Sequence, residues 1–327
     1  MSSWLRRRSP VKRQQLRPVL EFVGLPFLKL ALRLVRLYRP DFVPTSPHLY
    51  ALADRLGIYP LVDHYHDPPV RPAARDDTVP RQFPWLDLRV EAQLDLLRRL
   101  RYGEELSAIP LDYDGVTEPY YRNGLFGPVD AQLLYSLLRM ARPQLVMEVG
   151  SGESTRFATK ALAVNAAEGD AGRLVAIEPY GPPYLESLGV EVVRRRAEEV
   201  DPSVFKDLAA GDVLFIDSSH VPQPGGDVPF LLLEVLPALA PGVLVHVHDV
   251  FTPYDYPAEW SRRRWFWTEQ YVLEALLADN PRLEVLLAAA YLAREHPTDL
   301  AAACPVPESL SDIRTSSFWL RTCAVGA

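Results

Sequence analysis

The chain has 327 residues, of which 48% are hydrophobic and 24% charged, a composition that argues against intrinsic disorder. Two cysteines, Cys304 and Cys323, are too few for a disulfide framework, and no Cys/His spacing is typical of zinc, so a reducing, intracellular setting is expected. The net charge of -7 is uneven, because the first forty residues are basic and the remainder is acidic. An acidic body argues against a nucleic-acid-binding protein.

Residues 19–38 have the pattern of a basic amphipathic helix, with Lys29, Arg33 and Arg36 on one face and apolar side chains on the other. The basic residues interrupt the apolar run, so it is neither a membrane span nor a secretory signal. Two interpretations stay open. The apolar face lies on an anionic membrane surface or a partner, or it packs on the protein's own body. The first predicts a cytoplasmic protein at the inner face of a membrane.

Residues 40–85 are rich in proline around one short helical patch at 49–57, which is typical of an irregular linker. We therefore predict a domain boundary near residue 80. Residues 1–80 form a helical extension with its linker, and residues 81–327 form the main domain.

The main domain alternates apolar, β-branched runs with helical stretches, the pattern of a parallel sheet covered by helices. Helices are expected at 154–166 and 268–279. The sequence predicts a doubly wound α/β fold with a seven-stranded, mostly parallel sheet and helices on both faces. The strands are expected at 144–150, 172–180, 189–197, 211–219, 242–251, 282–292 and 316–322.

Polar residues follow the predicted strands at the ends where this fold binds ligands. We expect these residues to share one pocket. They are Glu148, Gly150 and Gly152 after the first strand, Glu178 after the second, the segment Arg196 to Glu198 after the third, Asp217 after the fourth, and His248 and Asp249 after the fifth.

The loop "EVGSGEST" has the G-x-G spacing of a dinucleotide site, but Thr155 stands where the third glycine is expected. Glu148 precedes the glycines, and its charge would repel a pyrophosphate but suits an ammonium or sulfonium group. Glu178 can accept hydrogen bonds from two ribose hydroxyls. No G-K-[ST] follows, so a phosphate-binding loop is not expected. These residues favour an adenosine with a cationic tail.

The segments "EVGSG", "AIEPY", "LFIDSSHV" and "PGV" give the chain, from about residue 120 onward, a resemblance to class I S-adenosylmethionine-dependent methyltransferases, closest to the bacterial type 24 enzymes. The resemblance implies that Glu148 orients the methionine amine and that Glu178 binds the ribose. It also implies that Ala197 and Glu198 lie beside adenine. The loop residues implied to pass close to the cofactor are Gly150, Ser151, Gly152, Ser154 and Thr155.

Methyl transfer to a hydroxyl needs a base, and His220 is the residue of its loop whose type titrates near neutrality. This region resembles the catechol-type methyltransferases, in which the position three after the aspartate of strand four, here Asp217, holds the catalytic base. The resemblance further implies that Asp217, Asp249 and His248 bind Mg²⁺ or Mn²⁺, although His248 stands where a harder oxygen ligand is expected. Alternatively, both aspartates cap loops and His248 is a hydrogen-bonded core residue.

Strand alternation predicts that His246 and His248 share one side of the fifth strand and that Asp249 faces away. Asp130, like Tyr121 and Asn123, could close the cofactor site from the other side, or it could cap a helix. Aromatic residues after the fifth strand could stack on an acceptor, or they could form a lid that packs on itself. These are Tyr254, Tyr256, Trp260, Trp265 and Trp267. Tyr121, ahead of the first strand, is a further candidate acceptor residue.

The leading hypothesis is an O-methyltransferase acting on a sugar, glycan, lipid-linked precursor or natural product. N-methylation stays open, because His220 would serve either reaction. Two alternatives come from other classes. One is a nicotinamide-dependent oxidoreductase, which Thr155 and the lack of a Tyr-x-x-x-Lys pair disfavour. The other is a membrane-docked binding module with a degenerate methyltransferase fold.

Overall fold

The structure, a computed structural model, describes residues 24–34, 47–56 and 76–324, except 114, 116, 263–264, 266, 308 and 311–313. The chain divides into two compact units, Met1–Pro72 and Ala73–Ala327. The two units are described separately below, and the sequence-based boundary near residue 80 stays a prediction.

The first unit contributes two described helices, residues 24–34 and α3 (Pro47–Leu56). The predicted helix at 19–38 therefore falls partly outside the described residues, but its described part is helical. Lys29 and Arg33 lie on it, and its large apolar side chains are exposed. None of the described helices is long and apolar enough to cross a membrane. Whether the apolar side chains meet a membrane, a partner or the protein body stays a prediction.

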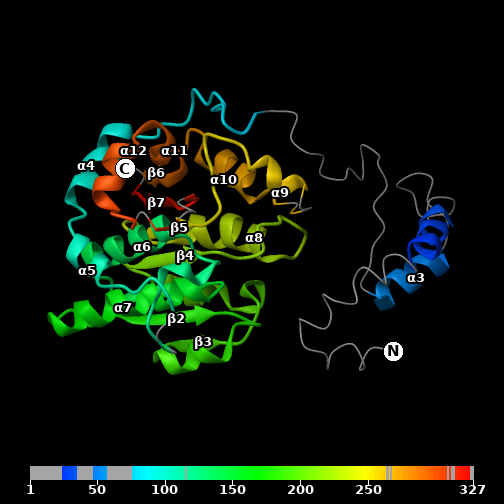
Figure 1. Ribbon diagram of the computed structural model, residues 1–327, viewed down its shortest axis with the longest axis horizontal. Helices are drawn as coiled ribbons and strands as arrows, with labels where there is room; N and C mark the ends of the chain where they lie inside the picture. Colours follow the sequence, from blue (N-terminus) through cyan, green and yellow to red (C-terminus); the bar gives the residue numbers. More distant parts are fainter. Residues whose placement is uncertain are drawn as a thin grey trace. The chain divides into compact units, whose positions relative to one another are not determined.

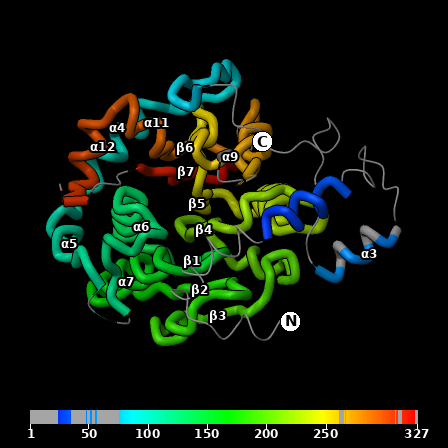
Figure 2. The backbone as a smooth tube through the Cα atoms, turned by 45° about the vertical axis from the view of Figure 1, so that its right-hand side comes forward, coloured from blue at the N-terminus to red at the C-terminus, as the bar shows by residue number. Residues whose placement is uncertain are grey.

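The second unit is built on a sheet whose seven described strands run in the order β3-β2-β1-β4-β5-β7-β6, from the bottom to the top of Figure 2. All pairs from β3 to β5 are parallel, whereas β7 pairs antiparallel with both β5 and β6. The predicted seven-stranded, mostly parallel sheet is confirmed. The strands are β1 (Leu145–Val149), β2 (Arg173–Ile177), β3 (Glu191–Val193), β4 (Val213–Ile216), β5 (Leu244–Val247), β6 (Leu283–Ala288) and β7 (Phe318–Thr322).

Alternation along the strands divides the core into two layers, one on each face of the sheet. Val146 and Phe215 pack with α6 and α7, while Met147 and Leu214 pack with the π-helical segment Phe230–Val235 and with α10. Figure 1 shows α6 and α7 on one side of the sheet and α8 and α10 on the other. The described helices of this unit are α4 (Val90–Arg99), α5 (Gly103–Ser107), α6 (Pro128–Ala141), α7 (Glu153–Ala167), α8 (Asp227–Pro229), α9 (Ala258–Arg262), α10 (Glu269–Leu277), α11 (Ala289–Glu295) and α12 (Pro297–Ala303).

The carboxyl ends of β1 and β4 approach each other closely at Gly150. This glycine has a φ of 80°, and a Cβ atom built on it would lie 1.7 Å from the carbonyl oxygen of Asp217. Strand pairing causes the contact, because the Asp217 amide donates to the Val149 carbonyl at 2.9 Å and so extends the β1–β4 ladder past its last residue. Only a residue without a side chain fits here.

We therefore expect Gly150→Ala to destabilise the protein by about 2 kcal/mol or more, from the left-handed backbone and from the clash with Asp217. Gly169→Ala is the matched control. Gly169 also has a positive φ, of 104°, but a Cβ atom there would meet nothing within 4 Å. Urea unfolding of both variants measures the difference. Equal losses of stability would show that the contact with Asp217 imposes no constraint.

Candidate functional site

The candidate residues gather at one edge of the sheet because β2, β1, β4 and β5 are neighbours and run parallel. The backbone hydrogen bonds between neighbouring strands continue into the loops that follow the strands. The Gly150 amide donates to the Ile177 carbonyl at 3.1 Å, and the His248 amide donates to the Ile216 carbonyl at 2.9 Å. The loops after β1, β4 and β5 are thereby held side by side, as the strand pattern predicted.

Glu148 is the penultimate residue of β1, and its side chain is buried beneath the loop that follows the strand. Its carboxylate accepts hydrogen bonds from the Ser154 and Thr155 hydroxyls at 2.6 and 2.7 Å. The Thr155 hydroxyl also accepts from the Gly152 amide at 3.0 Å. Burial raises the pKa of Glu148 to about 7, although these hydroxyl contacts oppose the shift. Ser154 and Thr155 therefore bind the carboxylate below the loop.

Glu178 follows β2 and joins two loops. Its carboxylate accepts hydrogen bonds from the backbone amides of Ser151 at 3.2 Å and Tyr180 at 2.6 Å, and the residue is half-buried. Ala197 and Glu198 belong to a short 3-10 helix, Ala197–Glu199, that begins four residues after β3 ends. Ala197 is buried, and the Glu198 side chain is 19% exposed.

The second group of candidates forms a cluster of carboxylates and imidazoles. One ligand atom each from Asp217, His248 and Asp249 lies within 4.8 Å of the others. The His248 Nδ1 atom is 3.3 Å from Asp249 Oδ1 and 4.0 Å from Asp217 Oδ1. These are the three residues for which the sequence resemblance implied a metal, and the structure brings them together.

Asp249 does not face away from His248, so that prediction was wrong. The alternation of β5 ends at Val247, and Asp249 has a φ of 57°, which turns its carboxylate back toward the His248 ring. His246 and His248 do share one side, with ring centroids 5.5 Å apart. The Nε2 atom of His246 contacts the Ser317 hydroxyl at 3.0 Å, and burial holds its pKa well below the usual value.

His220 is buried with a carboxylate at each ring nitrogen. Its Nδ1 atom is 2.9 Å from Glu269, and its Nε2 atom is 3.2 Å from Asp217 and 3.7 Å from Asp249. Burial alone would lower the pKa of His220, but the hydrogen bonds to Asp217 and Glu269 raise it to about 10. The ring centroid of Trp267 lies 4.3 Å from that of His220. The two carboxylates therefore favour the protonated form of His220 in this arrangement.

Glu269 and the role of Asp130 were missed by sequence reasoning. Glu269 begins α10, is fully buried, and faces His220 across the end of the sheet. Asp130 lies in the first turn of α6 but neither caps that helix nor reaches the β1 loop. Its carboxylate accepts from the amides of Ser316 and Ser317 at 3.1 and 3.0 Å and lies 3.7 Å from His248 Nε2. For Asp130 the sequence signal was the single acid of its helix, whereas Glu269 shares its helix with Glu274 and has no such signal.

A cavity of about 480 Å³ opens beside this cluster, with His248 and Asp249 in its wall. Of the predicted acceptor residues, Trp260, Trp265 and Tyr121 line it, and the Tyr121 hydroxyl donates to the Leu106 carbonyl at 2.8 Å. Tyr254, Tyr256 and Trp267 do not line it. The Tyr254 hydroxyl donates to Glu295 at 2.6 Å, and the Tyr256 hydroxyl accepts from the Gln270 amide at 3.1 Å. The aromatic residues are thus divided between a pocket wall and an inner packing layer.

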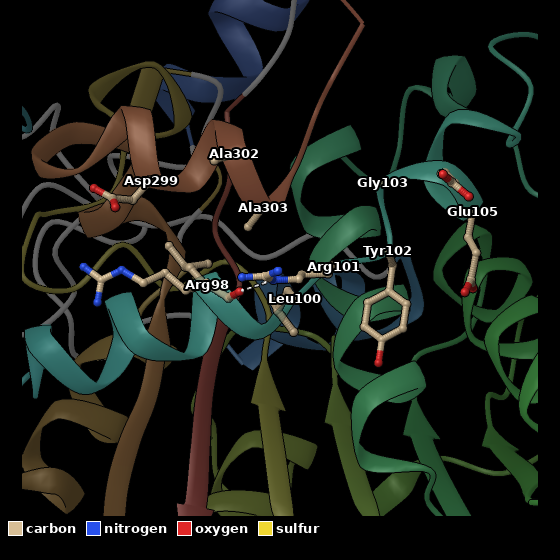
Figure 3. Close-up of a pocket in the computed structure, with 11 residues that line it drawn as sticks. Arg98, Leu100, Arg101, Tyr102, Gly103, Glu105, Asp299, Ala302 and Ala303 are labelled. Carbon is tan, nitrogen blue, oxygen red and sulfur yellow. Dashed lines mark hydrogen bonds between the residues drawn. The ribbon is translucent and has the colours of Figure 1, made fainter.

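A second cavity of about 610 Å³ lies between α4, α5 and α12. Figure 3 shows Arg98 and Arg101 at the end of α4, with Asp299 on α12 opposite them. None of the candidate residues lines this cavity. Of the polar candidates at the strand ends, His248 and Asp249 line the first cavity.

In a comparison with protein families, residues 147–250 match a family described as a methyltransferase domain. A search of curated proteins found no match. The chain is similar to the O-methyltransferase from Bacillus cereus in complex with SAH, at 16% identity over 71% of this chain and 91% of that chain, with a TM-score of 0.36. It is also similar to CalS11, a TDP-rhamnose 3'-O-methyltransferase of calicheamicin biosynthesis, at 16% identity over 74% and 96% of the two chains, with a TM-score of 0.39.

Likenesses this distant say nothing about the substrate or metal of this chain. The family match is different, because it begins in β1 and ends just after β5, and so includes the loops that carry Gly150, Glu178, Asp217 and His248. Residues 147–250 thus match a methyltransferase domain, and the resemblance of the sequence to the class I methyltransferases is confirmed.

Proposed function

We propose that this protein is an S-adenosylmethionine-dependent O-methyltransferase whose acceptor is a hydroxyl of a sugar, glycan or natural product. The observation that carries the proposal is the position of Asp217. Its backbone carbonyl packs against Gly150 of the β1 loop, and its side chain clusters with His248 and Asp249, two residues that line the cavity. A donor bound at the loop and an acceptor bound in the cavity meet there, as an in-line transfer requires.

The hydrogen bonds of the β1 loop favour a sulfonium donor over a dinucleotide. A pyrophosphate binds to free amides at the start of a helix. Here the Gly152 amide donates to Thr155 and the Ser151 amide donates to Glu178, so neither is available to an anion. The carboxylate of Glu178 instead makes the loop negative, and Glu148, with a pKa of about 7, adds a partial negative charge beneath it. This argues against the nicotinamide-dependent oxidoreductase.

The cavity next to the cluster suits a ring-shaped acceptor. Trp260 and Trp265 offer flat apolar surfaces, with ring centroids 5.5 Å apart, on which a sugar or aromatic ring could stack. Asp249 and His248 supply polar atoms in the same wall. An acceptor hydroxyl in the cavity would therefore approach the end of β5.

The residues of the cluster fit a divalent metal ion. Asp217 and Asp249 offer carboxylate oxygens, and both ring nitrogens of the buried His248 have no hydrogen-bond partner among the described residues. An ion held by these three residues would orient an acceptor hydroxyl and lower its pKa. The proposal assigns the donor side to Glu148 and Glu178 and the acceptor side to Asp249 and His248.

His220 is the proposed base, and Glu269 is the residue that positions it. The contact of Nδ1 with Glu269 leaves Nε2 as the nitrogen that exchanges a proton on the side of Asp217 and Asp249. The backbone supports this orientation, because the amides of Thr268 and Glu269 both donate to the His220 carbonyl. His220 acts as the base in its neutral form, after the imidazolium has lost its Nε2 proton to water, and it then takes the proton of the acceptor hydroxyl at Nε2.

The donor assignment predicts that the wild-type protein binds S-adenosylmethionine and that Glu178→Ala weakens this binding about tenfold or more. The reason is that a charge-assisted hydrogen bond to a ribose hydroxyl contributes about 1.5–3 kcal/mol. Isothermal titration calorimetry measures both dissociation constants. Glu186→Ala, which removes an exposed glutamate paired with Arg194 in the same region, should bind like the wild type. Unchanged binding by Glu178→Ala would refute the assignment.

The role of Glu269 predicts that Glu269→Gln lowers kcat about 10- to 100-fold, the usual effect of losing a carboxylate that orients a histidine. KM for S-adenosylmethionine should stay unchanged, because Glu269 contacts no part of the β1 loop. Transfer of labelled methyl to the acceptor gives both constants once a screen of sugars and phenols has found one. The control is Glu234→Gln on an exposed position. An equal change in both constants would indicate a structural role only.

A further inference from the structure

We infer that Asp217, His248 and Asp249 bind a first-row transition-metal ion of the Mn²⁺ to Zn²⁺ series in preference to Mg²⁺. The inference deepens the proposed function, because it concerns the ion at the acceptor side of the same site. It depends on the chemistry of His248, which this chain has in place of an oxygen ligand.

The separations in the cluster fit a single ion. Metal–ligand bonds of about 2.0–2.2 Å place two ligands of one ion about 3 Å apart at a right angle and about 4.4 Å apart when opposed. The His248 Nδ1 atom lies 3.3 Å from Asp249 Oδ1 and 4.0 Å from Asp217 Oδ1, within that range. The three residues come from the ends of β4 and β5, two paired strands, so their backbone positions are fixed by the sheet.

His248 is held as a metal-binding histidine would be. Its ring is 7% exposed, and neither ring nitrogen has a hydrogen-bond partner of suitable geometry among the described residues. Nδ1 faces the two carboxylates, while Nε2 faces Asp130 at 3.7 Å. A carboxylate behind the second nitrogen is the usual support of a histidine ligand, because it fixes the ring and makes the ligating nitrogen more basic.

Asp130 is itself fixed for this role. It is fully buried at the start of α6 and accepts hydrogen bonds from the Thr315 hydroxyl and from the amides of Ser316 and Ser317. The histidine is thus supported by a carboxylate from a different part of the chain that these hydrogen bonds hold in place.

The donor set determines the metal. Mg²⁺ prefers oxygen ligands in near-octahedral geometry, whereas an imidazole nitrogen favours Fe²⁺, Co²⁺, Ni²⁺ or Zn²⁺, and Mn²⁺ accepts both ligand types. One buried imidazole and two carboxylates therefore select against Mg²⁺. The competing account is that His248 is an imidazolium that neutralises Asp217 and Asp249 without any ion.

Direct binding to the full-length, chelator-treated protein tests the inference without donor or acceptor. Calorimetric titration with MnCl₂ and with MgCl₂ should give Mn²⁺ an affinity about 10- to 100-fold higher. Electron spin-echo spectroscopy of the bound Mn²⁺ should show coupling to an imidazole ¹⁴N nucleus. In His248→Asp, which supplies a third carboxylate, the coupling should vanish and the preference over Mg²⁺ should fall about tenfold.

His296→Asn is the matched control, because His296 lies at the start of α12 outside the cluster, and it should keep both the coupling and the preference. Equal affinities for Mn²⁺ and Mg²⁺, or bound Mn²⁺ without nitrogen coupling in the wild type, would overturn the inference. Absence of any bound ion would favour the imidazolium account. If His248→Asp does not fold, the wild-type spectrum still decides. If the protein binds Mn²⁺ as expected but transfers no methyl group, the metal inference holds and the proposed function fails. If the protein transfers methyl groups without any metal, the proposed function holds and the metal inference fails.

Discussion

The approach of Gly150 to the carbonyl of Asp217 is the constraint on which the rest of the site depends. Because position 150 has no side chain, the end of β4 can lie directly against the β1 loop. That contact fixes Asp217 between the loop on one side and the β5 end on the other. Glu148, Asp217 and His248 consequently lie on three neighbouring strand ends of a rigid sheet, and none depends on a flexible loop for its position.

The second organising feature is an excess of buried negative charge. Glu148, Asp130 and Glu269 are buried and Asp217 is half-buried, and the imidazoles of His220 and His248 lie among them. Burial would raise the pKa of Asp217, but the charge of His248 and the hydrogen bond from His220 hold it at about 2. The pKa of Glu269 stays raised because burial outweighs its contact with His220. Such an environment favours cationic ligands, which the sulfonium donor and a divalent ion both are.

Much of this arrangement could be predicted from the sequence. Buried parallel strands have a strong signal in runs of β-branched residues, and the carboxyl ends of such strands must share an edge. For that reason Glu148, Glu178, Asp217 and His248 could be grouped before the structure was known. The orientation of Asp249 could not, because alternation holds only within a strand and a positive φ leaves little trace in sequence. Glu269 and the contact of Asp130 with His248 were missed because both acids reach the site from helices, and the alternation of the strands does not place helical side chains. Tyr254 and Tyr256 are aromatic residues in a loop where an acceptor pocket is expected. Only the structure shows that their hydroxyls are hydrogen-bonded to Glu295 and to the Gln270 amide.

The central claim is that a donor site at the β1 loop and an acceptor site at the β5 end meet at Asp217. Crystals grown with S-adenosylhomocysteine and MnCl₂ test it most directly through anomalous diffraction at the manganese edge. The account predicts one manganese peak among Asp217, His248 and Asp249, with the sulfur of the ligand beside Gly150 to Gly152 and facing that peak. A ligand bound elsewhere, or one whose sulfur points away from Asp217, would contradict it.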